Sequence, residues 1–288
     1  MTDMSLPAAS LHGEIPNMPS ADYHALQALS ASGLRHLRRS PAHYYAAILD
    51  PERPAQEPTP AMRAGTMAHC ALFEPEALAE RYIVRPDGVD FRTKAGKEWR
   101  DAQPAGLEII DAAQMQTAQR QAAAVRALPD IAALLAEGRA EVSAVWRDDA
   151  TGALCRCRPD WVAPAGDGVV IIDGKTTQDA SPDGFGRSIW TYAYHLQAAW
   201  YIDGWQRATG QRVHGFVFAA VESAYPHAAA AYMLGDDVIA AARAECARLT
   251  ALYAECMRSG HWPGYNQDIN LINLPAWARM QLETINDN

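Results

Sequence analysis

The most constraining stretch of the sequence is Arg156–Lys175, which reads RCRPDWVAPAGDGVVIIDGK. Its second half, Gly168–Asp173, is β-branched and almost uninterrupted in apolar character, which indicates a strand buried on both faces. That strand ends in Asp173-Gly174-Lys175, and because side chains alternate along a strand, Asp173 and Lys175 point to the same face. Charged residues are rarely buried unless they are paired or bind a metal, so this strand end is an unusual way to pack a core.

The segment before this strand brings a second carboxylate to the same place. Ala153–Val162 is strand-like and contains Arg158-Pro159-Asp160 near its end, and Pro164–Gly168 can turn the chain back. Asp160 is then expected beside Asp173 on the neighbouring strand. Two carboxylates and a lysine at adjacent strand ends can hold a hard cation such as Mg²⁺ and act on a phosphate. The alternative is a surface hairpin with an ordinary Asp–Lys pair.

Other segments predict the rest of a sheet and its helices. Ala140–Arg147 alternates in polarity and predicts a strand, so with the two runs above it would form an antiparallel meander. Glu141, at its start, could lie near the metal site, although a salt bridge is the more ordinary role. Later strands are expected at Val213–Glu222 and Ala229–Leu234, and helices at Met62–Glu74, Leu107–Ala136 with a break at Pro129, Ile189–Trp205 and Val238–Arg258.

Two of these helices carry candidate site residues. Gly65 and His69 share a face of the first helix at i and i+4, and a glycine lets a helix approach another backbone closely. A lone helical histidine is more often a packed or surface residue than a ligand. The helix Ile189–Trp205 places further candidates on one face, namely Tyr194, Gln197 and Tyr201. An aromatic core stripe explains the tyrosines but not Gln197, because a buried amide needs partners.

The charge balance limits how the chain can bind nucleic acid. With 25 Lys and Arg against 34 Asp and Glu, the net charge of −9 argues against a protein that coats nucleic acid with a basic surface. An enzyme with a local basic channel remains possible. Candidate phosphate contacts lie on a helix capped by Ser30 or Ser32 and in a loop at Arg85–Arg100, and they are Arg35, Arg38, Arg39, Arg92, Lys94 and Lys97. A solvated helix face explains the first group equally well.

The chain reads as one large domain between two irregular ends. We expect a flexible leader over residues 1–20, a single domain of α/β (α+β) class over residues 21–265, and a tail over residues 266–288. The start lacks the basic and apolar regions of a secretory signal, and no run of about eighteen apolar residues predicts a membrane span. Five cysteines without a CxxC pair indicate a reduced, cytoplasmic protein.

Taken together, the motifs resemble a nuclease family. The ordered set is Gly65-Thr66 with His69, then Arg158-Pro159-Asp160, Asp173-Gly174-Lys175-Thr176-Thr177, and Tyr194-His195 followed by Gln197, Ala198, Ala199 and Tyr201. Over roughly residues 30–265, this set is similar to the RecE-type exonucleases (exodeoxyribonuclease VIII), in the RecB-like branch of the PD-(D/E)xK nuclease superfamily. Gly174 departs from the pattern, because relatives often carry an apolar residue there. The ligand expected at that position is a backbone carbonyl.

The resemblance implies a fold, an activity and a set of partners. The fold would be a PD-(D/E)xK core, a mixed central β-sheet flanked by helices. The activity would be degradation of one strand of linear double-stranded DNA from its 5′ end, with Mg²⁺ as cofactor and Mn²⁺ able to substitute. The remaining 3′ single strand would pass to a RecT-type annealing protein for recombination. Relatives form toroidal tetramers around DNA, which implies a homo-oligomer.

The resemblance also implies a role for each site residue. The main metal ion would be held by two carboxylates and one carbonyl, those of Asp160, Asp173 and Gly174. A second ion would be bound by His69. Lys175 would orient and activate the attacking water, and the DNA strand would be positioned by Gln197 and Tyr201.

Two other classes of protein are open. The related iron–sulfur nucleases of CRISPR adaptation need an upstream cysteine and a C-terminal cysteine group, and Cys246 and Cys256 lack that spacing. A catalytically inactive DNA-binding relative would not need Asp160, Asp173 and Lys175 intact.

Overall fold

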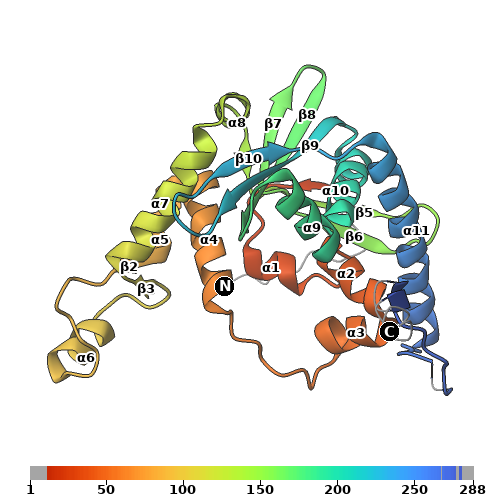
Figure 1. The fold of residues 1–288 in the computed structure, drawn as a ribbon, viewed down its shortest axis with the longest axis horizontal. Coiled ribbons are helices and arrows are strands. Elements are labelled where there is room, and N and C mark those ends of the chain that lie inside the picture. The colour runs from red at the N-terminus through yellow and green to blue at the C-terminus, as the bar shows by residue number, and fades with distance from the viewer. Residues whose placement is uncertain (1–11, 267, 277–278, 281–288) are drawn as a thin grey trace.

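The computed structural model describes residues 12–266, 268–276 and 279–280. Most of the expected leader, residues 1–11, therefore lies outside the described residues, as do residues 267, 277–278 and 281–288 of the expected tail. Helices and strands are interspersed along the described chain (Figure 1).

The strands are β1 (Gly13–Ile15), β2 (Tyr82–Val84), β3 (Glu108–Ile110), β4 (Arg139–Ala140), β5 (Ser143–Arg147), β6 (Leu154–Cys157), β7 (Trp161–Ala165), β8 (Gly168–Thr177), β9 (Arg212–Glu222) and β10 (Ala229–Tyr232). The α-helices are α1 (Ser20–Ala25), α2 (Ala31–Arg39), α3 (Pro41–Tyr44), α4 (Pro60–Phe73), α5 (Leu78–Arg81), α6 (Lys94–Asp101), α7 (Ala112–Arg126), α8 (Pro129–Leu135), α9 (Pro182–Thr191), α10 (Tyr194–Thr209) and α11 (Asp236–Ser259). A π-helical turn spans Tyr45–Leu49, and a 3₁₀ turn spans Pro75–Ala77.

A mixed five-stranded sheet in the order β10-β9-β8-β7-β4 forms the centre of the fold. β8 is parallel to β9 and antiparallel to β7, and the edge strands β10 and β4 pair antiparallel with their neighbours. Neighbouring residues of β8 face different cores, with Ile171 in one and Ile172 in the other, and both are fully buried. The prediction of a strand buried on both faces is therefore confirmed.

Helices cover both faces of this sheet, as Figure 1 shows. On one face, Phe216 and Phe218 of β9 pack among apolar residues of α2, α9, α10 and α11. On the other face, Val217 and Ala219 pack against α4, α7 and α8. Side chains alternate along β9, so one strand supplies both cores. This is the mixed central sheet flanked by helices that the family resemblance implied.

The expected three-strand meander is instead divided between two sheets. Its first strand is interrupted at Glu141, whose φ of 52° is left-handed, and this break separates β4 from β5. Its second run is interrupted at Arg158-Pro159-Asp160, which separates β6 from β7. β5 and β6 join β1 in an antiparallel sheet, whereas β4 and β7 belong to the central one. The two breaks meet, because the Glu141 N–H donates to the Asp160 carbonyl at 3.1 Å.

Three further segments differ from the sequence expectation. Residues 13–15, assigned to the loose leader, form β1 and pair with β5. The single helix expected at Ile189–Trp205 is two helices, α9 and α10, because Ala193 adopts a left-handed φ of 56° that an α-helix cannot contain. The expected loop Arg85–Arg100 contains α6, which Thr93 caps by accepting from the Gly96 N–H.

Within the described residues, every helix is too short or too polar to cross a membrane. All five cysteines are free thiols in buried positions, namely Cys70, Cys155, Cys157, Cys246 and Cys256.

Candidate metal centre and active site

The two predicted carboxylates lie where the pairing of β7 with β8 stops, just before β7 begins and in the middle of β8, which continues to Thr177. Trp161 is paired with Ile172, so Asp160 and Asp173 are the next positions along the two strands. The Gly174 N–H donates to Asp160 Oδ2 at 2.9 Å. The N–H and C=O of one strand residue point to the same side, so the Gly174 carbonyl also faces the strand that carries Asp160.

Helix α4 adds a histidine to these carboxylates. His69 Nε2 lies 3.0 Å from Asp160 Oδ2 and 3.6 Å from Glu141 Oε1. The close approach of α4 depends on Gly65, where an added Cβ would lie 3.3 Å from Thr176 Oγ1 at the end of β8. His69 therefore belongs to the site, rather than to an unrelated packed face of the helix.

Glu141 lies in the site, although a salt bridge was the more ordinary role expected for it from the sequence. One ligand atom each from His69, Glu141 and Asp160 lies within 4.8 Å of the others, which is compatible with a single cation. The left-handed backbone at Glu141 ends β4 and allows its side chain to reach this cluster. A break in the predicted strand Ala140–Arg147 would have pointed to this position of Glu141. The break itself could not be predicted, because a Glu in the left-handed conformation has no sequence signature.

The electrostatics of the cluster favour a cation. Burial alone would lower the pKa of His69, but Asp160, Glu141 and Asp173 outweigh burial and raise it to about 9. Burial, and then Asp160, raise the pKa of Glu141 to about 7, against the opposing effect of His69 and Arg158. The carboxylates therefore hold a proton on His69, and a divalent ion would satisfy the same excess of negative charge.

The Asp173 carboxylate is occupied by two neighbours. Its Oδ2 forms an ion pair with the Lys175 ammonium, and its Oδ1 accepts a hydrogen bond from the Gln197 side-chain amide. Lys175 Nζ also lies 4.8 Å from the centre of the Tyr194 ring. Burial would lower the pKa of Lys175, but Asp173 and Asp160 overcome it and raise the pKa, so the side chain stays charged. The amide that a core stripe could not explain thus fixes Asp173.

The cavity over these groups has a volume of about 450 Å³. Its lining includes His69, Glu141, Asp160, Asp173, Gly174, Lys175, Tyr194 and Gln197. Tyr201 does not line it. The Tyr201 ring packs edge-on against Phe216 at 5.9 Å and borders a smaller cavity of about 230 Å³ on the other side of Gln197.

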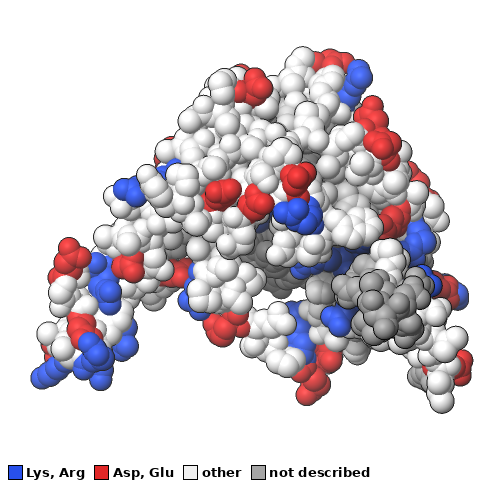
Figure 2. Space-filling model, in the orientation of Figure 1, with Lys and Arg blue, Asp and Glu red and all other residues white. Residues whose placement is uncertain are grey.

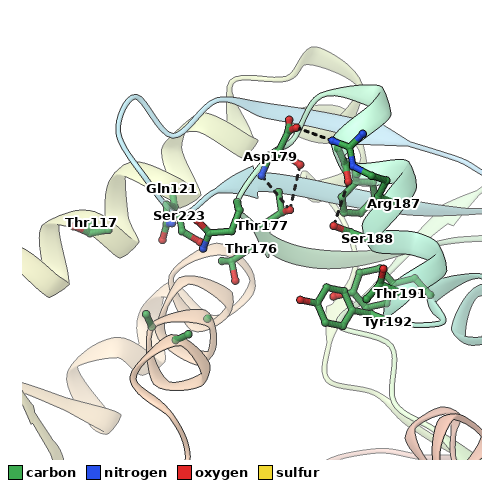
Figure 3. A pocket seen from close by; sticks show the side chains of 17 residues that line it. Thr117, Gln121, Thr176, Thr177, Asp179, Arg187, Ser188, Thr191, Tyr192 and Ser223 are labelled. Atoms are coloured by element: carbon green, nitrogen blue, oxygen red, sulfur yellow. Dashed lines mark hydrogen bonds and ion pairs between the residues drawn. The ribbon is translucent and has the colours of Figure 1, made fainter. Parts of the chain in front are cut away.

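A second groove of about 550 Å³ continues from this cavity, and Gly65, Gln121, Thr176 and Tyr194 line both. Figure 3 shows its polar lining, with Thr176 and Thr177 at the end of β8 facing Gln121, Ser188 and Ser223. Arg187 of α9 lies 3.5 Å from Asp179 at its edge. The candidate metal centre is therefore adjoined by a hydroxyl-rich groove.

The six predicted phosphate contacts form two separate groups. Arg92, Lys94 and Lys97 lie at or near α6, at the tip of an arm that projects from the body, where Figure 2 shows blue side chains with red ones between them (Figures 1 and 2). The second group is on α2, and its members have different neighbours. Arg38 lies 3.2 Å from Glu245 and over Trp190, and Arg39 donates to the Tyr265 hydroxyl at 3.2 Å.

Gly174 should tolerate no side chain. An added Cβ would lie 2.8 Å from Phe73 Cε2, and the Phe73 ring packs against the His69 ring at 4.9 Å. We expect Gly174→Ala to lower the free energy of unfolding by about 1–3 kcal/mol, since overpacking displaces α4. Urea denaturation measures this, with Gly186→Ala as control, because a Cβ at Gly186 meets no neighbouring atom. Equal stability of Gly174→Ala and wild type would contradict the tight contact.

A match to a known protein family agrees with this geometry. A family model described as a PDDEXK-like domain of unknown function (DUF3799) matches residues 30–275. The chain belongs to this PDDEXK-like family. Asp160, Asp173 and Lys175 thus lie inside the matched segment of a PDDEXK-like domain, in a fold of the PD-(D/E)xK type.

Solved structures support the fold of this PDDEXK-like chain. A crystal structure from Eubacterium rectale, described as a "putative exonuclease", has a TM-score of 0.59 and 14% identity, and the match covers 92% of this chain and 97% of that one. At that identity the likeness bears on the fold alone. A structure described as SSO0001 has a TM-score of 0.28 and 14% identity, over 48% of this chain and 65% of that one. None of the curated proteins matches the chain.

Proposed function

We propose that this PDDEXK-like protein is a metal-dependent exodeoxyribonuclease of the RecE type, acting on linear double-stranded DNA from the 5′ end. The observation that carries the proposal is the convergence of His69, Glu141, Asp160, Asp173 and Lys175 in one cavity. Family membership and the description of the Eubacterium rectale protein support a nuclease. The open groove beside the cavity suits an extended polymer better than an enclosed small molecule.

Some residues of the site would bind the metal ion, and others would stabilise charge in the reaction. His69, Glu141 and Asp160 would hold a divalent cation such as Mg²⁺ or Mn²⁺, with the Gly174 carbonyl on the same side. Bound there, the cation would acidify water and neutralise phosphate charge. Lys175 keeps a positive charge beside Asp173, where it stabilises charge that develops as water attacks phosphorus. Gln197 holds the Asp173 carboxylate in place, whereas Tyr201, which lines only the neighbouring smaller cavity, would position the DNA strand from there.

The biological setting is part of the same proposal. The product would be a 3′ single-stranded tail, which a RecT-type annealing protein would use in recombination. A homo-oligomer that surrounds the duplex, such as a tetramer, would keep the enzyme on its substrate. Binding to the duplex would come from local basic positions on α2 and near α6, because the net charge of −9 gives no general attraction to DNA.

A single assay tests the activity and its polarity. Linear duplex DNA carrying different fluorophores at its 5′ and 3′ ends is incubated with Mg²⁺, with Mn²⁺, or with EDTA. We expect mononucleotides from the 5′-labelled end to be released first, no release in EDTA, and restored release when metal is added in excess. Cleavage in EDTA at the full rate would overturn the metal-dependent mechanism, and release from 3′ ends first would overturn the polarity.

A further inference from the structure

A small cavity of about 230 Å³ lies beside the metal centre and has no role in the proposed hydrolysis. His24, Tyr194 and Gln197 line both this cavity and the metal-site cavity, so the two are neighbours. The positively charged side chains on its wall are Arg35 and Arg156, and among the described residues that line it there is no Asp or Glu. We call it the arginine cavity.

Arg156, on β6, is a buried cation that has no anionic partner among the residues that the structure describes. The residue is only 8% exposed, and its Nε and Nη1 are buried with no hydrogen-bond partner among the described residues. Its guanidinium lies over the Tyr23 ring at 4.6 Å, a contact that compensates part of the lost hydration. Burial lowers the pKa of Arg156, in keeping with an uncompensated charge. A buried guanidinium normally has an anion beside it.

The N-terminus of α2 opens onto the same cavity. Ser30, Ala31 and Ser32 line it, and Ser30 Oγ caps the helix by accepting from the Gly33 N–H at 3.3 Å. In the described structure the N–H groups of Ala31 and Ser32 make no hydrogen bond, as is usual in a first helical turn. These donors and the positive end of the helix dipole favour an anion, and Arg35 follows one turn later on the same wall.

We propose that the arginine cavity binds a phosphate group of the DNA substrate other than the one being hydrolysed. Two guanidinium groups, a helix N-terminus and the Ser30–Ser32 hydroxyl pair, in which one hydroxyl donates to the other at 3.0 Å and leaves one free to donate, form a set that matches phosphate oxygens. The identity of the ligand as DNA rests on the proposed nuclease function. The phosphate is either the monoester at a strand end or an internal diester next to the scissile bond, and the two sources share the same chemistry.

Binding of inorganic phosphate tests the cavity without metal, DNA or catalysis. All measurements are made in EDTA. The melting temperature is compared between phosphate and chloride buffers of equal ionic strength, and the affinity for phosphate is measured by calorimetry. We expect Arg35→Gln and Arg156→Gln each to weaken phosphate binding by about tenfold or more, since each removes charge-assisted hydrogen bonds. Arg248→Gln on α11 is the matched control, because this exposed arginine pairs with Glu245 and lines none of these cavities. If Arg156→Gln does not fold, Arg35→Gln and Ser32→Ala decide the result.

A cleavage assay then distinguishes the two sources. Duplexes with 5′-phosphate, 5′-hydroxyl or 3′-phosphate ends are compared in single turnover. A terminal monoester predicts that wild type prefers one phosphorylated end by about tenfold, and that Arg35→Gln removes this preference. An internal diester predicts equal rates on all ends, with Arg35→Gln weakening binding of every duplex and reducing the salt slope by about 1.

The proposal is overturned if Arg35→Gln and Arg156→Gln match Arg248→Gln in phosphate affinity, end preference and salt slope. Its failure is distinct from failure of the proposed function. If the wild-type protein cuts no DNA but Arg35→Gln lowers its phosphate affinity, the anion site stands and the proposed nuclease function fails. If the wild-type protein cuts DNA and the two arginine variants match the control in every measurement, the nuclease function stands and the anion site fails.

Discussion

Replacing Lys175 with alanine should lower the rate of DNA hydrolysis on the order of a hundredfold or more. The Lys175 ammonium is the charge paired with Asp173 inside the cavity, whereas His69, Glu141 and Asp160 remain to bind metal in the variant. Metal affinity and duplex affinity should therefore change little. Single-turnover cleavage at saturating Mg²⁺, together with metal and DNA titrations, separates these quantities.

The Lys175 variant needs a control for stability, because among the described residues it leaves the buried Asp173 carboxylate with Gln197 as its one partner. Breaking a buried pair is costly, so the melting temperature should fall. Arg248→Ala controls for removal of a cation elsewhere, and assays are run well below the melting temperature. A folded Lys175→Ala protein that cuts DNA at the wild-type rate would remove Lys175 from the mechanism.

The second large effect concerns the metal ligands. His69→Ala and Glu141→Gln should each weaken Mg²⁺ affinity by about tenfold or more, and excess Mn²⁺ should restore part of the activity, since Mn²⁺ binds such sites more tightly than Mg²⁺. Calorimetric titration of both ions measures this directly. Glu76→Gln, in the 3₁₀ turn after α4, is the control for loss of a carboxylate outside the site.

The same two variants should change the stability of the metal-free protein in opposite directions. The raised pKa of His69 means that its charged form stabilises the fold at pH values below about 9, and His69→Ala loses this stabilisation. The raised pKa of Glu141 means that the fold loses stability as the pH rises toward about 7, that this loss is complete at higher pH, and that Glu141→Gln removes it. Melting in EDTA at pH 8 should therefore fall for His69→Ala and hold or rise for Glu141→Gln. If His69→Ala kept normal metal dependence, His69 would be only a packed residue.

The six predicted phosphate contacts differ in how free their charge is and in how near they lie to the candidate site. Arg38 pairs with Glu245 and stacks on Trp190, and Arg92 forms an ion pair with Asp90. Arg35 instead lines a cavity that borders the active site. Under the proposed function, we therefore expect Arg35 to contact a phosphate near the site of hydrolysis, and the positions near α6 to contact the duplex farther away. Separate neutralisation of the two groups would show this in their salt slopes.

The sequence by itself determined the central part of this protein. The apolar run before Asp173 specified a strand buried on both faces, because only β8 in the middle of a covered sheet can bury every side chain. The alternation of side chains then required Asp173 and Lys175 to share a face. The turn before this strand allowed the chain to run back, so that Asp160 could lie beside Asp173. The i and i+4 spacing of Gly65 and His69 likewise indicated which face of α4 meets the sheet.

The tertiary structure alone decided the rest, because it depends on backbone conformations that no residue type announces. Glu141 reaches His69 and Asp160 through a left-handed backbone position, and Ala193 divides one expected helix in the same way. The arginine cavity combines β6, α1, α2 and α10, which are distant in sequence, so no local pattern could predict that Arg156 would be buried without an anion. Periodicity reports which face of an element is buried, whereas the contacts between faces depend on how separate elements pack.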